Sequence, residues 1–171
     1  MKKLLMIISL VFLLCFTFSC QKQAEEAKPT VDIEAEKSAV KTLIDDWIKC
    51  IEAEDMELLS KFISHDDNMV FFGTDAAERW VGWEPLKESM QKQFDSVDNT
   101  HLKIRELVIK VHNSGEVAWV SLLWDFKGEA MGEQFSIEGA RVTGVLEKRN
   151  GNWVFVQSHT SMPVTGQVVK Y

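Results

Sequence analysis

Four consecutive strand-like segments in the second half of the chain constrain its fold more than any other feature. Turn-forming stretches rich in Asn and Gly separate them, the last being Asn150-Gly151. Short connections of this kind join neighbouring antiparallel strands, so the run predicts an antiparallel sheet. The expected strands span 102–111, 116–127, 133–149 and 152–162.

Helical periodicity dominates the part of the chain before these strands. Apolar residues recur at three- and four-residue spacing from Val40 to Ile51, which predicts a helix over about residues 33–52. Asp55 can cap a second, short helix, and Pro85 can open a third. Helices followed by hairpin strands predict an α+β domain with the helices packed on one face of the sheet.

The N-terminus has the pattern of an export signal. Two lysines precede an apolar run that is too short for a membrane span and that ends at Ser19-Cys20. A small residue before a cysteine resembles the lipobox of bacterial lipoproteins, in which the cysteine is lipidated, although two neighbouring positions depart from that motif. Ordinary signal cleavage is the alternative. We expect a protein anchored by lipid in the bacterial cell envelope, facing the periplasm or the exterior.

The expected domain organisation follows from these boundaries. The segment after Cys20 is polar and charged, as in a flexible tether, and the remaining chain is long enough for one domain with a real core. The expected parts are a signal peptide over 1–19, a tether over 20–32, a folded domain over 33–165 and a tail over 166–171.

Composition limits the possible partners. The chain has 26 acidic and 19 basic residues, a net charge of −7, and loss of the leader would make it more acidic. An acidic chain without a basic run is a poor candidate for binding nucleic acid or anionic lipid surfaces. With Cys20 lipidated, Cys50 would remain as a buried thiol. No glycine-rich phosphate loop or CxxC motif is present, and we expect no cofactor.

Polar residues alternate where the last two expected strands end. Arg141 and Thr143 lie on one strand, and Gln157 and His159 on the other, beyond aromatic residues that suit the floor of a half-buried pocket. A two-residue loop at Asn150-Gly151 would turn Arg141 to the wrong face. We favour a three-residue loop that pairs Arg141 with His159 and Thr143 with Gln157 on one face.

Each candidate side chain has a chemical interpretation and a structural one. Arg141 could bind a carboxylate or a similar anion, or form an ion pair with a helix carboxylate. His159 could be a general base or acid, or simply hydrogen-bond the backbone. Asp125 could be a base if its apolar neighbours raised its pKa, or it could lie at a strand edge in water.

Other residues give weaker signals. Trp80, Trp83 and Trp119 could line a pocket, or could be core residues that need no ligand. Asp75 and Glu78 flank a turn before Trp80 and are expected in a solvated loop, although they could rim a pocket mouth. The segment His65-Asp66-Asp67 looks like a metal cluster but lacks a second histidine at ligand spacing, so we expect no metal site.

The strands are apolar on both faces. Trp119 and Leu123 point to one face of their strand, and Val120 and Trp124 to the other. A sheet with one solvated face should alternate more cleanly. We therefore expect a homodimer in which the second face of the sheet meets the sheet of another subunit.

The order of the elements resembles that of a known family. Together with Gly73-Thr74-Asp75, the stretch from Glu78 to Gly82 and the C-terminal polar pattern, it resembles the SnoaL-like branch of the nuclear transport factor 2-like superfamily over about residues 34–163. The resemblance implies a cone-shaped α+β fold in which helices and a curved sheet enclose one apolar pocket. It also implies frequent dimers, and functions that range from ketosteroid isomerases, polyketide cyclases, scytalone dehydratase and limonene epoxide hydrolase to binding domains.

Fold alone therefore does not decide the function. The one tyrosine is Tyr171, the last residue, which disfavours the isomerase and dehydratase chemistries that use pocket tyrosines. We expect a small-molecule-binding domain whose ligand is small, partly apolar and anionic, bound by Arg141. The alternative is a cyclase, isomerase or hydrolase with His159 or Asp125 as general base and Arg141 as anion holder, and a purely structural assembly module is a third possibility.

Overall fold

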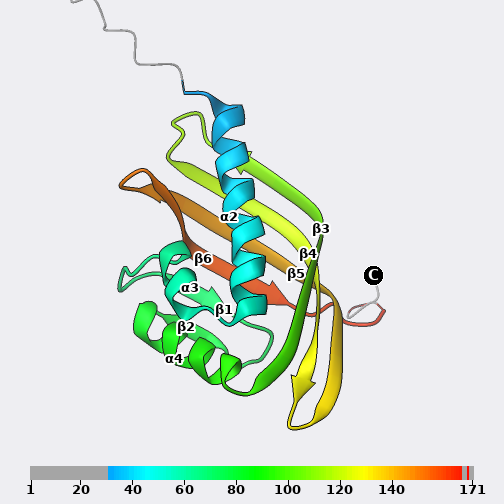
Figure 1. Cartoon of the computed structure of the whole chain (residues 1–171). Helices are drawn as coiled ribbons and strands as arrows, with labels where there is room; N and C mark the ends of the chain where they lie inside the picture. Colours follow the sequence, from blue (N-terminus) through cyan, green and yellow to red (C-terminus); the bar gives the residue numbers. More distant parts are fainter. Residues whose placement is uncertain (1–30, 167–168, 170–171) are drawn as a thin grey trace, which may run out of the picture. The chain divides into compact units, whose positions relative to one another are not determined.

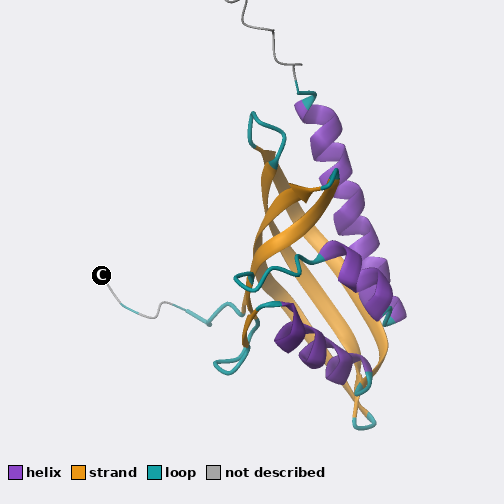
Figure 2. Ribbon diagram, turned by 90° about the vertical axis from the view of Figure 1, so that its left-hand side faces the viewer, coloured by secondary structure: helices purple, strands orange, loops and turns teal. Residues whose placement is uncertain are grey.

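The computed structural model describes residues 31–166 and residue 169. In this part of the chain, helices precede four long strands, and the helices lie on one side of the sheet (Figures 1 and 2). The predicted α+β class is confirmed. The elements are α2 (Ile33–Ala53), α3 (Met56–Phe62), β1 (Val70–Phe72), β2 (Arg79–Val81), α4 (Trp83–Phe94), β3 (Val97–Val111), β4 (Val117–Ala130), β5 (Glu133–Arg149) and β6 (Asn152–Ser161).

The six strands form one mixed sheet in the order β2-β1-β6-β5-β4-β3. Three consecutive hairpin connections make β3 to β6 antiparallel, as the turn signals predict. The short strand β1 pairs in parallel with β6, with Phe71 beside Ser158. This parallel pair was not predicted, because two segments so distant in sequence share no local signal.

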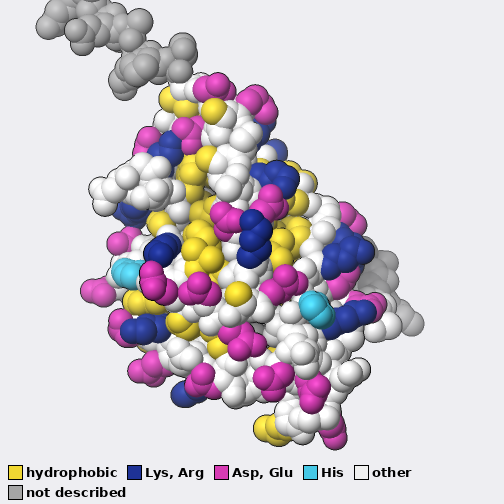
Figure 3. Space-filling view, in the orientation of Figure 1, with side chains coloured by type: hydrophobic (Ala, Val, Ile, Leu, Met, Phe, Trp, Pro, Cys, Tyr) yellow, Lys and Arg dark blue, Asp and Glu magenta, His cyan; other side chains and the backbone are white. Residues whose placement is uncertain are grey.

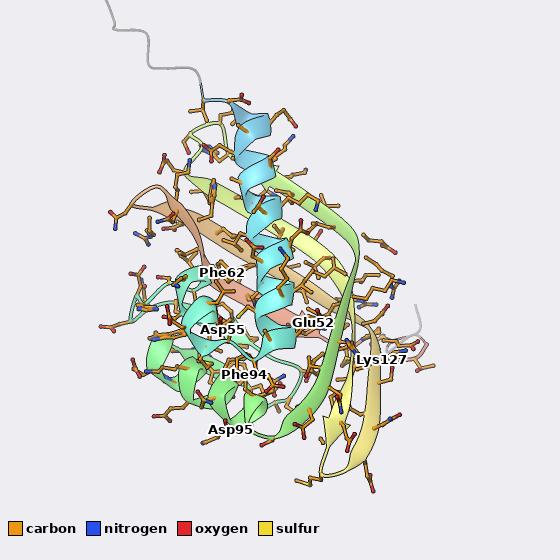
Figure 4. All side chains as sticks on the ribbon, viewed as in Figure 1. Glu52, Asp55, Phe62, Phe94, Asp95 and Lys127 are labelled. Carbon is orange, nitrogen blue, oxygen red and sulfur yellow. The ribbon has the colours of Figure 1, made fainter. Side chains whose placement is uncertain are left out.

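Capping and an apolar stripe define the first two helices. The Asp32 side chain accepts a hydrogen bond from the Ala35 backbone N–H at 3.0 Å, and Asp55 accepts one from Leu58 N–H at 2.9 Å, as expected for α3 (Figure 4). The inward stripe of α2 includes Val40, which is fully buried. The predicted helices over 33–52 and after Pro85 are therefore confirmed.

Both ends of α2 are fixed to the sheet. Near its start, Glu36 accepts hydrogen bonds from Lys148 Nζ on β5 and, at 3.0 Å, from Trp153 Nε1 on β6. In its last turn, Glu52 accepts a 2.9 Å hydrogen bond from the Leu102 backbone N–H on β3, and Figure 4 shows Glu52 at this end of the helix. These contacts attach both ends of α2 to the sheet and hold the helix across the strands.

The β5–β6 hairpin has a two-residue turn. Arg149 pairs with Asn152, and both turn residues have positive φ values, 51° for Asn150 and 84° for Gly151. These are the values that a type I′ turn requires, and they match the right-handed twist of the strands. The predicted three-residue loop is therefore wrong.

A bulge further along the same hairpin changes the register once more. Leu146 pairs with Phe155, whereas Val145 pairs with Gln157, so Val156 is an extra residue in β6. The resulting pairs are Thr143 with His159, Arg141 with Ser161 and Val145 with Gln157. The predicted Arg141–His159 and Thr143–Gln157 pairs are both wrong.

The three other long strands, β3, β4 and β5, also have irregularities, which lie beside one another in the sheet. Register shifts lie between Arg105 and Val108 in β3 and between Trp124 and Phe126 in β4, and Gly139 in β5 has a φ of 69°. Bulges increase the local twist and bend a strand. Gly139 lies at the register shift between β4 and β5.

The predicted signal peptide, the predicted lipidation site at Cys20 and most of the predicted tether lie outside the described residues. Among the helices that the structure does describe, none is both long and apolar enough to span a membrane.

Candidate functional site

A cavity of about 410 Å³ lies between the helices and the inner face of the sheet. Its walls come from α2, α3 and α4, from β1 and β2, and from the inward positions of the long strands. On this side of the molecule, Figure 3 shows hydrophobic side chains reaching the surface around α2. The aromatic side chains of the walls include Trp47, Phe71, Trp80, Trp124, Phe126 and Phe135.

A small number of polar groups interrupt the apolar walls. They come from three places: the inner face of β6, one face of α4 and the loop between β1 and β2. Among the lining residues in the described part of the chain, Glu78 is the one ionisable side chain, and none is Lys, Arg or His. The polar lining residues are Ser158, Thr160, Ser89, Gln93, Thr74 and Glu78.

The carboxylate of Glu78 closes the loop between β1 and β2. Its Oε2 accepts hydrogen bonds from the backbone N–H groups of Thr74, at 2.5 Å, and Asp75, at 3.0 Å. The carboxylate lies against Gly73, where a Cβ would come within 2.2 Å of Oε2. The absence of a side chain at Gly73 therefore allows Glu78 to lie over the backbone at the cavity wall, so Glu78 is half-buried at a pocket and not in the solvated loop that the sequence favoured.

Trp124 brings an unpaired donor to the site. Its ring stacks on Trp47 with centroids 5.5 Å apart and planes 5° apart. Its Nε1 is buried and has no hydrogen-bond partner among residues 31–166. Buried polar groups are nearly always paired, so this indole N–H is an exception within the described core.

The predicted polar cluster lies on the other face of the sheet. Arg141, Thr143 and His159 are exposed and Gln157 is half-buried, and none of the four lines the cavity. The register brings them to one face, as expected, but the cavity face carries their neighbours Ser158 and Thr160. The expectation that these four residues form the pocket floor is wrong, and the ring of His159 instead lies edge-on to Phe72, with centroids 5.6 Å apart.

Asp125 also lies on the outer face and is held in an ion pair. Arg105 donates to it from Nε at 2.9 Å and from Nη2 at 2.8 Å, and Gly139 donates its backbone N–H at 2.9 Å. The hydrogen bonds from Arg105, and then that from Gly139, lower the pKa of Asp125 to about 2. A raised pKa, which the interpretation of Asp125 as a base required, is not found.

The three tryptophans proposed for the pocket separate in the structure. Trp80 lines the cavity. Trp83 is buried in the core, and His65 stacks on it with ring centroids 4.6 Å apart. Trp119 lies on the outer face of β4 with 44% of its surface exposed. One of the three pocket assignments therefore agrees with the structure.

The His65-Asp66-Asp67 segment has structural contacts instead of a metal-binding arrangement. His65 Nε2 lies 3.1 Å from Ser60 Oγ, and Asp66 accepts a 2.8 Å hydrogen bond from Arg149. Within the described residues, no group of three His, Cys, Asp or Glu side chains is placed to hold a metal ion.

A second hollow of about 570 Å³ lies along β3 and β4 but is an open, charged groove. Its basic residues are Lys103, Arg105 and Lys127, and Asp125 and Glu138 oppose them. The Arg105–Asp125 pair already satisfies two of these groups. The apolar cavity between the helices and the sheet is therefore the stronger candidate for a binding site.

Several cavity residues escaped the sequence analysis. Ser158 and Thr160 alternate with the residues that it chose, and the bulge at Val156 decided which set faces inward. Ser89 and Gln93 on α4 are spaced four residues apart, next to the inward Leu86 and Met90. That spacing is a signal that could have been found, because residues at i and i+4 share one helix face.

Solved structures with the same architecture define the fold class. A nuclear transport factor 2-like superfamily protein from Salmonella enterica serovar Typhimurium is similar at 21% identity and a TM-score of 0.71, covering 81% of this chain and 99% of that one. A protein of the nuclear transport factor 2-like family from Streptomyces avermitilis, provisionally named a dehydratase, is similar at 14% identity and a TM-score of 0.67, and the match covers 78% of this chain and 99% of that one. A nuclear transport factor 2-like protein of unknown function from Pseudomonas putida is similar at 17% identity and a TM-score of 0.60, and the match covers 76% of this chain and 88% of that one.

These likenesses show that the protein has the nuclear transport factor 2-like fold. A family model for the SnoaL-like domain matches residues 40–165, and the chain belongs to this family. No curated protein matches the chain.

Proposed function

We propose that this SnoaL-like domain binds a small, partly apolar molecule in the cavity between α2, α4 and the sheet. The observation that carries the proposal is the cavity itself: about 410 Å³ of space walled by aromatic side chains, with a few polar groups at defined positions. Sites for small molecules generally have this size and composition.

The position of Arg141 removes the reason for expecting an anionic ligand. Arg141 and His159 are exposed on the outer face, away from the cavity lining. The catalytic alternative, with His159 or Asp125 as base and Arg141 as anion holder, likewise finds none of its groups in the cavity. Binding is therefore the function that the geometry favours.

A cavity-filling variant tests the proposal. Ser89 lines the cavity from α4, so Ser89→Trp should fill it with little disturbance of the core. Ser38→Trp, on the exposed face of α2, is the matched control. A thermal-shift screen of neutral steroids, polyketide-like aromatics, amines and carboxylates should identify compounds that stabilise the wild type and the control but not Ser89→Trp. Equal stabilisation of all three proteins would place binding elsewhere and contradict the proposal.

We also propose that the protein acts as a homodimer through the outer face of its sheet. Four large apolar side chains lie exposed there, in two pairs at opposite edges of the sheet: Trp119 at 44% and Val108 at 50% on β4 and β3, and Phe72 and Val81 at 39% each on β1 and β2. Exposed apolar side chains on a sheet face are a feature of association surfaces. The cavity lies on the other side of the sheet, so the dimer would leave it accessible.

A lipid anchor at Cys20 is proposed from the sequence alone. It would hold the domain at the cell envelope on the tether. Incorporation of labelled palmitate into the wild type, and its loss in Cys20→Ala, is the expected result, and equal labelling of the two would contradict the anchor.

A further inference from the structure

We infer that the ligand of this cavity is a lipophilic amine, with its ammonium group directed to Glu78. This inference rests on the proposed binding function and specifies the chemical class that the site selects. It opposes the anionic ligand expected from the sequence. Three features support it: the isolation of the Glu78 carboxylate, the aromatic rings beside it and the charge of the whole lining.

Glu78 carries an acceptor that the protein leaves free. Its Oε2 accepts from Thr74 and Asp75, whereas Oε1 accepts no hydrogen bond from residues 31–166. No Lys, Arg or His in that range lies within ion-pair distance of this carboxylate, whereas exposed carboxylates elsewhere in the domain, such as Glu34, Asp45 and Asp66, have basic partners. A carboxylate beside an apolar cavity is most stable with a cationic partner, and here a ligand would have to supply it.

The backbone holds this carboxylate in a fixed position. The Gly73 N–H donates to the Glu78 carbonyl at 2.8 Å, so the two residues extend the β1–β2 pairing by one position. The two N–H bonds to Oε2 then fix the side chain itself. A preorganised acceptor of this kind loses little conformational entropy when it binds a cation.

Aromatic rings lie next to the carboxylate on the same inward face. Residues two apart in a strand share a face, so Trp80 follows Glu78 there, and Phe71 precedes Gly73. Phe71 and Trp80 are direct cross-strand partners, and both line the cavity. A carboxylate beside aromatic faces is the combination that recognises an ammonium group, by a charge-assisted hydrogen bond and by cation–π attraction.

The charge of the lining excludes the opposite class. Glu78 is the only charged side chain in the described lining, which contains no basic residue. The nearest arginine in sequence, Arg79, points to the other face, where its guanidinium lies 5.9 Å from the centre of the Phe72 ring. A carboxylate ligand would therefore meet like charge and no cation.

Three probes with one ring system separate the possible outcomes. We would titrate the wild type, Glu78→Gln and Glu88→Gln with 1-naphthylmethylamine, 1-naphthylmethanol and 1-naphthoate at pH 7 by calorimetry. Glu78→Gln keeps an oxygen that can accept from Thr74 and Asp75 but removes the charge. Glu88 is an exposed residue of α4 outside the cavity, so Glu88→Gln makes the same charge change elsewhere.

The expected order of affinity in the wild type is amine, then alcohol, then carboxylate. The amine should lose about tenfold in affinity in Glu78→Gln, the alcohol less than about twofold, and Glu88→Gln should match the wild type. Naphthoate binding as tightly as the amine would overturn the inference while leaving the binding function intact. An equal loss of amine affinity in Glu78→Gln and Glu88→Gln would overturn it in the same way. Failure of all three probes to bind the wild type would count against the binding function itself. The wild-type ranking stands even if Glu78→Gln does not fold.

Discussion

Arg105 binds Asp125 through two parallel hydrogen bonds, of 2.9 and 2.8 Å, between neighbouring strands of the outer sheet face. Asp125 also accepts the Gly139 N–H from the next strand. One carboxylate thus connects β3, β4 and β5 at the irregularities where the sheet bends. The inward neighbours of Asp125, Trp124 and Phe126, line the cavity, so this outer cluster helps to set the shape of the inner wall.

This cluster predicts a pH-dependent contribution to stability. The folded-state pKa of Asp125, about 2, lies below its ordinary value of 3.8, so the stabilisation is present above pH 4 and is lost as the pH falls toward 2. Asp125→Asn should lower the urea midpoint at pH 7, and its difference from the wild type should narrow as the pH falls from 5 to 2. A difference that stays constant over this range would contradict the role of the charge.

Glu36 should contribute to the attachment of α2. Glu36→Ala would leave Lys148 Nζ and Trp153 Nε1 without their acceptor, in a side-chain pair only 20% exposed. The free energy of unfolding should fall by about 1–3 kcal/mol, measured by urea denaturation. Glu34→Ala is the control, since the Glu34–Lys37 pair is exposed and should contribute less than about 1 kcal/mol. Equal effects of the two changes would show that the Glu36 contacts add nothing specific.

Gly73→Ala should affect the site through sterics alone. The new Cβ would lie 2.2 Å from Glu78 Oε2 and would displace the carboxylate from its two backbone donors. We expect the variant to bind 1-naphthylmethylamine several-fold more weakly, while its affinity for 1-naphthylmethanol changes less. Parallel losses for both probes would indicate general damage to the cavity.

Trp119→Glu should weaken the proposed dimer. The side chain lies exposed on β4, so the change removes apolar surface and adds charge without disturbing the core. Light scattering should report a dimer for the wild type at micromolar concentration and a monomer for the variant. Val164→Glu, at an exposed position beyond the last strand, should remain dimeric. A monomeric wild type would contradict the proposal directly.

The sequence predicted the fold much better than the site. Local signals placed α2, the Asp55 cap and the bounds of β5, because each depends on residues close together in the chain. The face on which a polar residue lies depends on the register, and one residue of slip exchanges the two faces. The two-residue turn at Asn150-Gly151 and the bulge at Val156 combined to leave the expected cluster on one face.

That face nevertheless proved to be the outer one. Trp153 and Phe155 are buried, and the bulge at Val156 puts Ser158 and Thr160 on the side that lines the cavity, in place of Gln157 and His159. Asp125 was misjudged similarly, since its partner Arg105 is 20 residues away in the chain. Such long-range contacts leave no periodic signal in a single sequence.

The six tryptophans provide the most direct test of the central claim, that a small molecule binds in the cavity. Trp47, Trp80 and Trp124 line the cavity, whereas Trp83, Trp119 and Trp153 do not. Indole N–H resonances should be recorded in a nitrogen–proton correlation spectrum while 1-naphthylmethylamine and 1-naphthylmethanol are added, and assigned by single Trp→Phe variants. We expect saturable shifts in the three cavity tryptophans, with the resonances of the other three nearly unchanged. Shifts confined to Trp119, or no shift in any of the six, would contradict binding in this cavity.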